Sequence, residues 1–232
     1  MPGKPLSGLS SLGFAAVIVS LCFAVTALES PLQAPPKWEY LQPLEETTDS
    51  ESSNLVKANH SVATPEKAGN ITLTITARTK MTTVTGVRLE ILRHPDWEKG
   101  QPGKDAGQLV VRELRANVRT LSQTDQANRV GIKNIFASQG SNAEHIIDQD
   151  LLTGWSVPIA SNRIRRVILE LPSPLIFDDP AEWTFSVDLM IPEGIRYPDQ
   201  LRFAVTDGSR LNVSADESLL GAPWRFSGVS IL

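Results

Sequence analysis

Cysteine is almost absent from this chain of 232 residues, and the one cysteine is Cys22. The rest of the chain therefore cannot form an intramolecular disulfide, a thiolate zinc site or a cysteine nucleophile. Cys22 lies in an apolar run and acts there as a small apolar residue. The alternative, a lipidation site, is disfavoured by the bulky Leu21 directly before it. A domain built from this sequence must be stabilised by its hydrophobic core, which is feasible at this length.

The chain also lacks a surplus of basic residues and the motifs of common enzymes. It carries 22 lysines and arginines against 26 aspartates and glutamates, a net charge of −4. The chain has no excess of cationic side chains that could neutralise phosphates, so we expect no nucleic-acid binding. The three histidines, His60, His94 and His145, are not at metal-ligand spacing, and no G-x-S-x-G motif occurs. We therefore expect the protein not to be an enzyme.

The N-terminal segment 1–28 has the pattern of an export signal. Lys4 supplies positive charge, residues 12–28 are apolar or small without charge, and small residues stand at 25–27. This is typical of a cleaved signal peptide. The alternative is an uncleaved hydrophobic helix that anchors the chain to the inner membrane through residues 12–28, since the run is just long enough to span a bilayer. Either reading predicts an exported protein, periplasmic or at the cell surface, that meets the membrane only through this segment.

Residues 29–69 have the composition of a loosely ordered linker. Five prolines interrupt the segment, and T-T-D-S-E-S-S at 47–53 contains no apolar residue. Such a stretch buries too little apolar surface to offset its ordering entropy. Trp38 and Tyr40 alternate with polar residues, so W-E-Y-L at 38–41 is expected to form a short strand that docks on the main domain.

From residue 70 onward, apolar residues alternate with polar ones at a period of two, which is typical of strands with one buried and one wet face. Gly, Pro and Asp clusters separate the runs, as turns require. The pattern predicts an all-β domain at 70–232, an antiparallel β-sandwich without a helical interior. Its expected inward-facing residues are Ile71, Leu73, Ile75 and Ala77, then Val87, Leu89 and Ile91, then Val167, Leu169 and Leu171, then Trp183, Phe185, Val187 and Leu189, and finally Leu201, Phe203 and Val205.

Three segments resemble a known module. They are V-T-G-V-R-L-E-I-L-R-H-P at 84–95, G-Q-P-G-K-D-A-G-Q-L-V-V-R-E-L at 100–114 and I-I-D-Q-D-L-L-T-G-W at 146–155. Over residues 38–207 the chain is similar to the discoidin-like (coagulation-factor type C) β-sandwich of large exported, cytochrome-c-associated bacterial proteins. The resemblance implies a jelly roll of the galactose-binding-like kind and a binding or structural role, without an activity. Gln149 and Ala204 depart from the family pattern, and no C-x-x-C-H haem motif is present.

Two groups of residues are candidates for a site. Asp148, Asp150 and Thr153 lie within six residues, and the resemblance allows a structural calcium near this turn. The alternative is that these side chains only cap the turn by bonding backbone N–H groups. The Gly- and Pro-rich loop 94–107 offers a second surface, with Trp97, Lys99 and Lys104 as expected ligand contacts.

Other residues of note have plainer interpretations. Trp155 and Trp183 are expected in the core, because large aromatic side chains are usually buried. Asp178 and Asp179, followed by Pro180, indicate a turn rather than a catalytic carboxylate pair. Arg163, Arg165 and Arg166 form a small basic cluster that is expected at a solvated strand end, and binding of an anionic group is the alternative.

These observations favour an exported, non-catalytic module that binds a carbohydrate or a protein partner through its loop end. The alternative is a structural or assembly subunit, tethered by its N-terminal segment, that docks on a larger cytochrome-type complex. No cofactor is required by either hypothesis, and calcium is the one candidate.

Overall fold

The protein is a β-sandwich in a computed structural model that describes residues 37–48, 59–65, 68–92, 108–122, 127–158, 164–193, 200–208 and 225–227. All of these belong to one compact unit, Ala34–Leu232. The strands are β1 (Trp38–Tyr40), β2 (Gln42–Thr48), β3 (Ser61–Ala63), β4 (Gly69–Thr79), β5 (Thr83–Leu92), β6 (Gln108–Thr120), β7 (Asn128–Arg129), β8 (Asn134–Ala137), β9 (Trp155–Pro158), β10 (Arg165–Ile176), β11 (Ala181–Ile191), β12 (Gln200–Thr206) and β13 (Arg225–Ser227). A short 3-10 helix, η2 (Ala143–Ile147), lies between β8 and β9.

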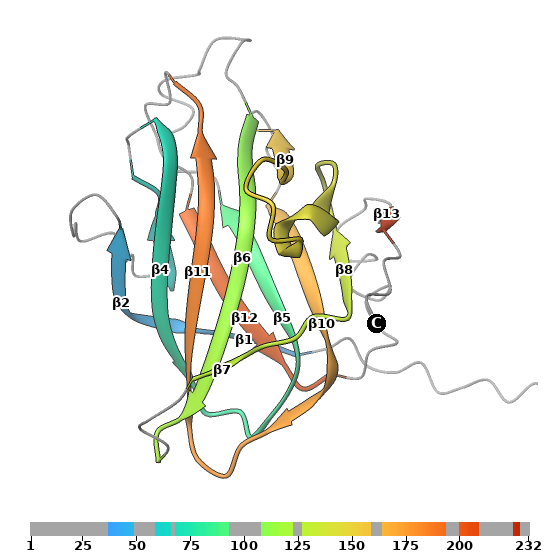
Figure 1. Ribbon diagram of the computed structural model, residues 1–232. Helices are drawn as coiled ribbons and strands as arrows, with labels where there is room; N and C mark the ends of the chain where they lie inside the picture. The colour runs from blue at the N-terminus through green and yellow to red at the C-terminus, as the bar shows by residue number, and fades with distance from the viewer. Residues whose placement is uncertain are drawn as a thin grey trace, which may run out of the picture. The chain divides into compact units, whose positions relative to one another are not determined.

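The strands form two sheets, which we name sheet A and sheet B. Sheet A has the order β1-β12-β5-β10-β8-β13, and β3 also pairs with β12. Sheet B has the order β2-β4-β11-β6-β7, and β9 also pairs with β6. The pairings among the described strands are antiparallel. Figure 1 shows β2, β4, β11 and β6 in front of β12, β5 and β10, so the predicted antiparallel sandwich is confirmed.

The core lies between the sheets and contains every side chain that the period-two pattern placed inward. Each of those residues is at most 3% exposed. The alternation fixes the register, because a slip by one residue would turn a whole apolar row toward water. Trp183 and Phe185 of β11 stack on each other, and the Phe185 ring stacks on Phe203 of β12 with centroids 3.9 Å apart. These aromatic contacts join the two sheets, since β11 and β12 belong to different layers.

The outer face of sheet A departs from the expectation of a wet face. Arg88 and Glu90 alternate with the core residues of β5, yet both are buried. The guanidinium group of Arg88 lies over the Trp38 ring, 4.4 Å from its centroid, and 5.5 Å from that of Tyr40. Aromatic rings and charged partners therefore cover positions that the alternation assigned to solvent. The expected solvated strand end at Arg165 and Arg166 is also wrong, because Arg165 is fully buried and Arg166 pairs with Glu90.

Sheet pairing extends into the segment 29–69. Strand β1 pairs with β12, as the expected docking strand at W-E-Y-L would, and β2 and β3 pair with β4 and β12. The ladder hydrogen bonds of these neighbours order a stretch whose composition is that of a linker. The sheets thus use residues that come before the predicted domain start at residue 70.

In the described part of the chain, no helix combines the length and the apolar character needed to cross a membrane. The expected N-terminal hydrophobic helix and signal segment, residues 1–28, lies outside the described residues.

Candidate functional site

The predicted binding loop cannot be placed, because Trp97, Lys99 and Lys104 lie outside the described residues. The loop joins β5 to β6, so it precedes β6 at Gln108. The ligand contacts assigned to it remain a prediction.

The structure describes the predicted turn and brings the side chains of Asp148 and Thr153 together, whereas the Asp150 carboxylate binds the backbone of the turn. The Asp148 carboxylate accepts hydrogen bonds from the Asp150 N–H (2.8 Å) and from the Thr153 hydroxyl (2.7 Å). The Asp150 carboxylate accepts one from the Leu152 N–H at 2.9 Å. These are the bonds expected for side chains that cap a turn. Among the described residues, no three Asp, Glu, His or Cys side chains are grouped as metal ligands would be, and calcium at this turn remains a prediction.

A buried glutamate on β6 holds the turn against sheet B. Glu113 is 1% exposed, and its Oε2 accepts a hydrogen bond from the Gln149 N–H at 3.0 Å. Gln149 has φ 66°, the left-handed region that glycine adopts most easily, and it stands where the discoidin-like pattern has glycine. Burial raises the pKa of Glu113, and the nearby Asp148 acts in the same direction, while the Gln149 N–H and Arg115 oppose them. No motif in the sequence indicates this contact between Glu113 and Gln149.

The end of the turn leads into a tightly packed tryptophan. Trp155 is fully buried, as expected, and its indole N–H donates to the Gln139 carbonyl at 2.7 Å. Gly140 has φ 91°, and a Cβ there would lie 2.3 Å from the Trp155 Nε1. Only glycine fits at that position. Leu151 and Leu152, at the tip of the same turn, are 49% and 90% exposed. The turn is therefore a firmly held segment that presents two apolar side chains to solvent.

A hollow of about 310 Å³ lies beside the turn, which we name the side hollow. Its apolar lining comes from both sheets and the segment between β7 and β8, and Gln149 and Ile147 border it. Its lining residues are Leu114, Arg115, Ala116, Arg129, Val130, Gly131, Ile132, Ile147, Gln149 and Leu169. Arg115 is already bound to Asp188 at 2.6 Å, which reduces its capacity to bind a ligand.

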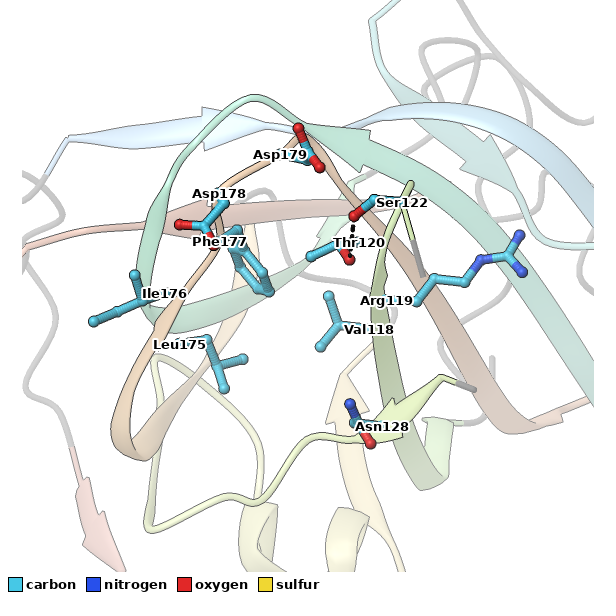
Figure 2. Close-up of a pocket in the computed structure, with 10 residues that line it drawn as sticks. All are labelled: Val118, Arg119, Thr120, Ser122, Asn128, Leu175, Ile176, Phe177, Asp178 and Asp179. Carbon is cyan, nitrogen blue, oxygen red and sulfur yellow. Dashed lines mark hydrogen bonds between the residues drawn. The ribbon is translucent and has the colours of Figure 1, made fainter. Parts of the chain in front are cut away.

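A second hollow of about 280 Å³ lies at the far end of β6, and we name it the end hollow (Figure 2). It is lined by Val118, Arg119, Thr120, Ser122, Asn128, Leu175, Ile176, Phe177, Asp178 and Asp179. These residues come from the end of β6 and the turn after it, from β7, from the end of β10 and from the β10–β11 connection. The end hollow lies at the C-terminal end of β6, at Thr120. The predicted binding loop leads into the N-terminal end of the same strand, at Gln108.

The floor of the end hollow is apolar. In Figure 2 the side chains of Val118, Leu175 and Phe177 point toward one another, and Ile176 points away from them. The Phe177 ring meets Trp183 edge to face, with centroids 6.4 Å apart, so the floor continues into the aromatic core. Backbone bonds fix the connection: the Phe177 N–H donates to Thr82 (2.8 Å) and the Leu121 N–H to Pro180 (3.2 Å). The floor is therefore preformed.

The rim of the end hollow is polar, and three of its side chains have no partner among the described residues. Asp178, Asp179 and Asn128 are exposed, and their side chains make no hydrogen bond or ion pair within the described part of the chain. The Thr120 and Ser122 hydroxyls lie 3.2 Å apart (Figure 2). Carboxylate, amide and hydroxyl groups next to an apolar floor can bind a small molecule that is polar at its edges and apolar on its face.

Sequence reasoning placed Asp178 and Asp179 in a turn, which the structure confirms, but it did not find the hollow they border. The walls come from segments some 50 residues apart in the chain, at about 118–128 and 175–179. Only the pairing of β6 with β11 brings them together, at Ala181 and Thr120. An isolated D-D-P sequence carries no signal of that pairing.

Comparison of the chain with protein-family models, with curated proteins and with solved structures finds no match. The candidate site is therefore defined by its own geometry.

Proposed function

We propose that this chain is an exported, non-catalytic binding module with a jelly-roll fold of the discoidin-like kind, and that it recognises a carbohydrate in the end hollow. The observation that carries this proposal is a preformed apolar floor bordered by Asp178, Asp179 and Asn128, whose side chains have no partner among the described residues. The resemblance of residues 38–207 to discoidin-like modules is a second, weaker support.

The connection order supports the jelly roll. Successive strands β4, β5, β6, β8, β9, β10, β11 and β12 alternate between sheet B and sheet A. Their neighbours are β4-β11-β6-β9 in one layer and β12-β5-β10-β8 in the other, and the short β7 stays beside β6 in sheet B. A jelly roll is a double sheet whose chain crosses between layers in this way, and lectin domains are among the proteins that use it. Because one fold hosts many functions, the fold does not identify the ligand, and the support for a carbohydrate comes from the end hollow.

The chemistry of the end hollow suits a sugar ring. Sugar hydroxyls both donate and accept, so they match the carboxylates of Asp178 and Asp179, the Asn128 amide and the hydroxyls of Thr120 and Ser122. The apolar C–H face of a pyranose can rest on Val118, Leu175 and Phe177. A volume of about 280 Å³ is close to the roughly 300 Å³ lower limit of small-molecule sites. We therefore expect one ring, at a chain end or a branch, to occupy the hollow.

A saccharide screen with matched variants tests the proposal. Calorimetry or affinity electrophoresis on soluble polysaccharides should detect binding by the wild type. Asp179→Asn should weaken it about tenfold, the loss of one charged hydrogen bond, and Asn128→Ala about fivefold, the loss of a neutral one. Glu193→Gln removes an exposed carboxylate outside the hollow and should leave affinity unchanged. Absence of saccharide binding by the wild type overturns the proposal. Binding that survives both hollow variants but is lost in Trp97→Ala would move the site to the predicted loop.

The exposed Leu151 and Leu152 favour one second candidate, an assembly subunit that docks on a larger exported, cytochrome-type complex. A leucine held at 90% exposure by a hydrogen-bonded turn is ready to enter an apolar pocket of a protein partner without further ordering cost. Its test is purification of the complex from native membrane and soluble fractions. Leu152→Ser should abolish co-purification of the partner, whereas Leu44→Ser, a matched change at an exposed leucine of β2, should not. Equal recovery with both variants would exclude the turn as the docking site.

A further inference from the structure

The charges around the end hollow are unbalanced. Asp178, Asp179 and Arg119 are the charged residues of its lining. The Arg119 Nε donates to Glu182 at 2.9 Å, and Figure 2 shows the Arg119 side chain pointing away from the hollow. Glu182 is bound as well by Arg78, at 2.8 Å, so this arginine is committed to a separate cluster on the outer face of sheet B. The two aspartates have no cationic partner within the described residues.

The carboxylates of two consecutive residues give the rim of the end hollow a negative potential, which is screened less on the side of the low-dielectric floor than on the side of the solvent. A neutral hydroxyl that binds there leaves this charge uncompensated. A cationic group on the ligand compensates the charge and forms charge-assisted hydrogen bonds, which are stronger than neutral ones. The rim therefore favours a ligand with a positive charge at its edge.

We infer that the carbohydrate is an amino sugar with a free, protonated amine, which Asp178 and Asp179 bind at the rim while the ring rests on Val118, Leu175 and Phe177. This inference rests on the proposed function and specifies its ligand. Asn128 and the Thr120 and Ser122 hydroxyls bind the neutral hydroxyl groups of the same ring. An organic cation fits this site better than a bare metal ion, because the charge borders an apolar floor and, among the described residues, no three Asp, Glu, His or Cys side chains are grouped as metal ligands would be.

The apolar floor supports this choice independently of the charge. Val118 and Phe177 are buried, and the backbone fixes both: Val118 is paired with Trp183 of β11, and the Phe177 N–H donates to Thr82. Such a surface binds the C–H face of a ring and contributes little to a hydrated inorganic ion. The combination of an apolar floor with an anionic rim therefore selects a ligand that carries both a ring and an ammonium group.

Three β-1,4-linked tetrasaccharides that differ only at carbon 2 test the inference. Cellotetraose has a hydroxyl there, N-acetylchitotetraose has an amide and fully deacetylated chitotetraose has an amine. Calorimetry in a mildly acidic buffer of low ionic strength, in which the amine is protonated, should give the amine the highest affinity, about fivefold or more above the hydroxyl. Raising the ionic strength or deprotonating the amine should remove the preference.

Matched variants assign the preference to the rim. Asp178→Asn and Asp179→Asn should each reduce the preference for the amine over the hydroxyl, while Glu193→Gln retains it. The melting temperature and the near-ultraviolet circular dichroism of the buried Trp183 check that each variant is folded.

The outcomes separate this inference from the proposed function. If cellotetraose binds as tightly as the amine and the hollow variants abolish both, the carbohydrate site stands and the amino-sugar inference fails. If the preference for the amine persists in both aspartate variants, the amine binds elsewhere and the inference also fails. If none of the three binds, the amino-sugar inference is overturned, and the wider saccharide screen decides the proposed function separately.

Discussion

Glu90 and Glu113 occupy comparable places in the two layers but have opposite surroundings. Each is a buried glutamate on the outer face of a sheet, at 0% and 1% exposure. Glu90 accepts hydrogen bonds from the Nε atoms of Arg166 (2.8 Å) and Arg202 (2.9 Å) and lies 3.1 Å from the Nε of Arg88. Glu113 has one backbone donor, Gln149, and its Oε1 has no hydrogen-bond partner, with the nearest guanidinium nitrogen, that of Arg129, 3.9 Å away.

The two carboxyl groups therefore titrate in opposite directions. Burial acts to raise the pKa of both. At Glu90 the three guanidinium groups, Arg88 first among them, outweigh burial, and the pKa falls below its ordinary value. At Glu113 burial dominates and the pKa rises. The comparison shows that a buried charge is tolerated in proportion to the number of opposite charges and hydrogen-bond donors that surround it.

The largest effect is expected from removing the charge of Glu90. Glu90→Gln leaves three largely buried guanidinium groups without their carboxylate, and breaking such a buried pair costs about 3–5 kcal/mol. Urea denaturation followed by tryptophan fluorescence should show this loss in the free energy of unfolding. A loss below about 1 kcal/mol would mean that water reaches the cluster and that burial of Glu90 is not the controlling factor.

The pH dependence of stability should distinguish the two glutamates. The pKa of Glu90 is lowered in the folded state, so its stabilising contribution is present above the ordinary value of 4.5 and is lost as the pH falls through the folded pKa. The pKa of Glu113 is raised, so its contribution is fully present below 4.5 and is lost as the pH rises through the folded pKa.

The melting temperature of Glu113→Gln should therefore rise relative to the wild type as the pH increases above 4.5. That of Glu90→Gln should fall relative to the wild type as the pH increases from the folded pKa of Glu90 to 4.5, and the difference should stay constant above 4.5. Wild type and variant both contain the charged groups around Glu113, namely Arg129, Arg115 and Asp148. The difference between their melting curves therefore reports on the Glu113 carboxyl group. Parallel curves for wild type and Glu113→Gln would show that the carboxyl is well solvated.

A smaller effect is expected at Glu182, where the same chemistry occurs near the surface. Arg119 and Arg78 hold the pKa of Glu182 below its ordinary value, but both arginines are about half exposed. Glu182→Gln should cost no more than about 1 kcal/mol in the free energy of unfolding. The cost should shrink further at high ionic strength, which urea titrations at two salt concentrations can measure.

The smallest effect is expected at Leu152, which is 90% exposed. Leu152→Ser should change the free energy of unfolding by no more than about 0.5 kcal/mol, as surface substitutions usually do. Differential scanning calorimetry checks this. A larger loss would show that Leu152 packs against another part of the protein, and it would then be unsuitable as a docking residue.

Much of the sandwich could be predicted because its core follows a local rule. Residues such as Leu73, Phe185 and Phe203 alternate with polar neighbours, and alternation within one strand is enough to assign the buried face. The capping role of Asp148 and Thr153 was likewise one of the two readings of the turn, because the two residues are five apart in the chain. The burial of Arg88 and Glu90 could not be predicted, since it depends on Trp38, Tyr40 and Arg202 from distant strands.

The sequence by itself determined that two sheets form and which face of each strand is apolar, because side-chain alternation is a property of consecutive residues. The tertiary structure decided where charge is buried, where a hollow opens and which carboxylates lack partners. These features arise from pairings between strands that are distant in the chain, such as β6 with β11 and β5 with β12. The free energy of a charge depends on everything within a few ångströms of it, so it is fixed only when those strands meet.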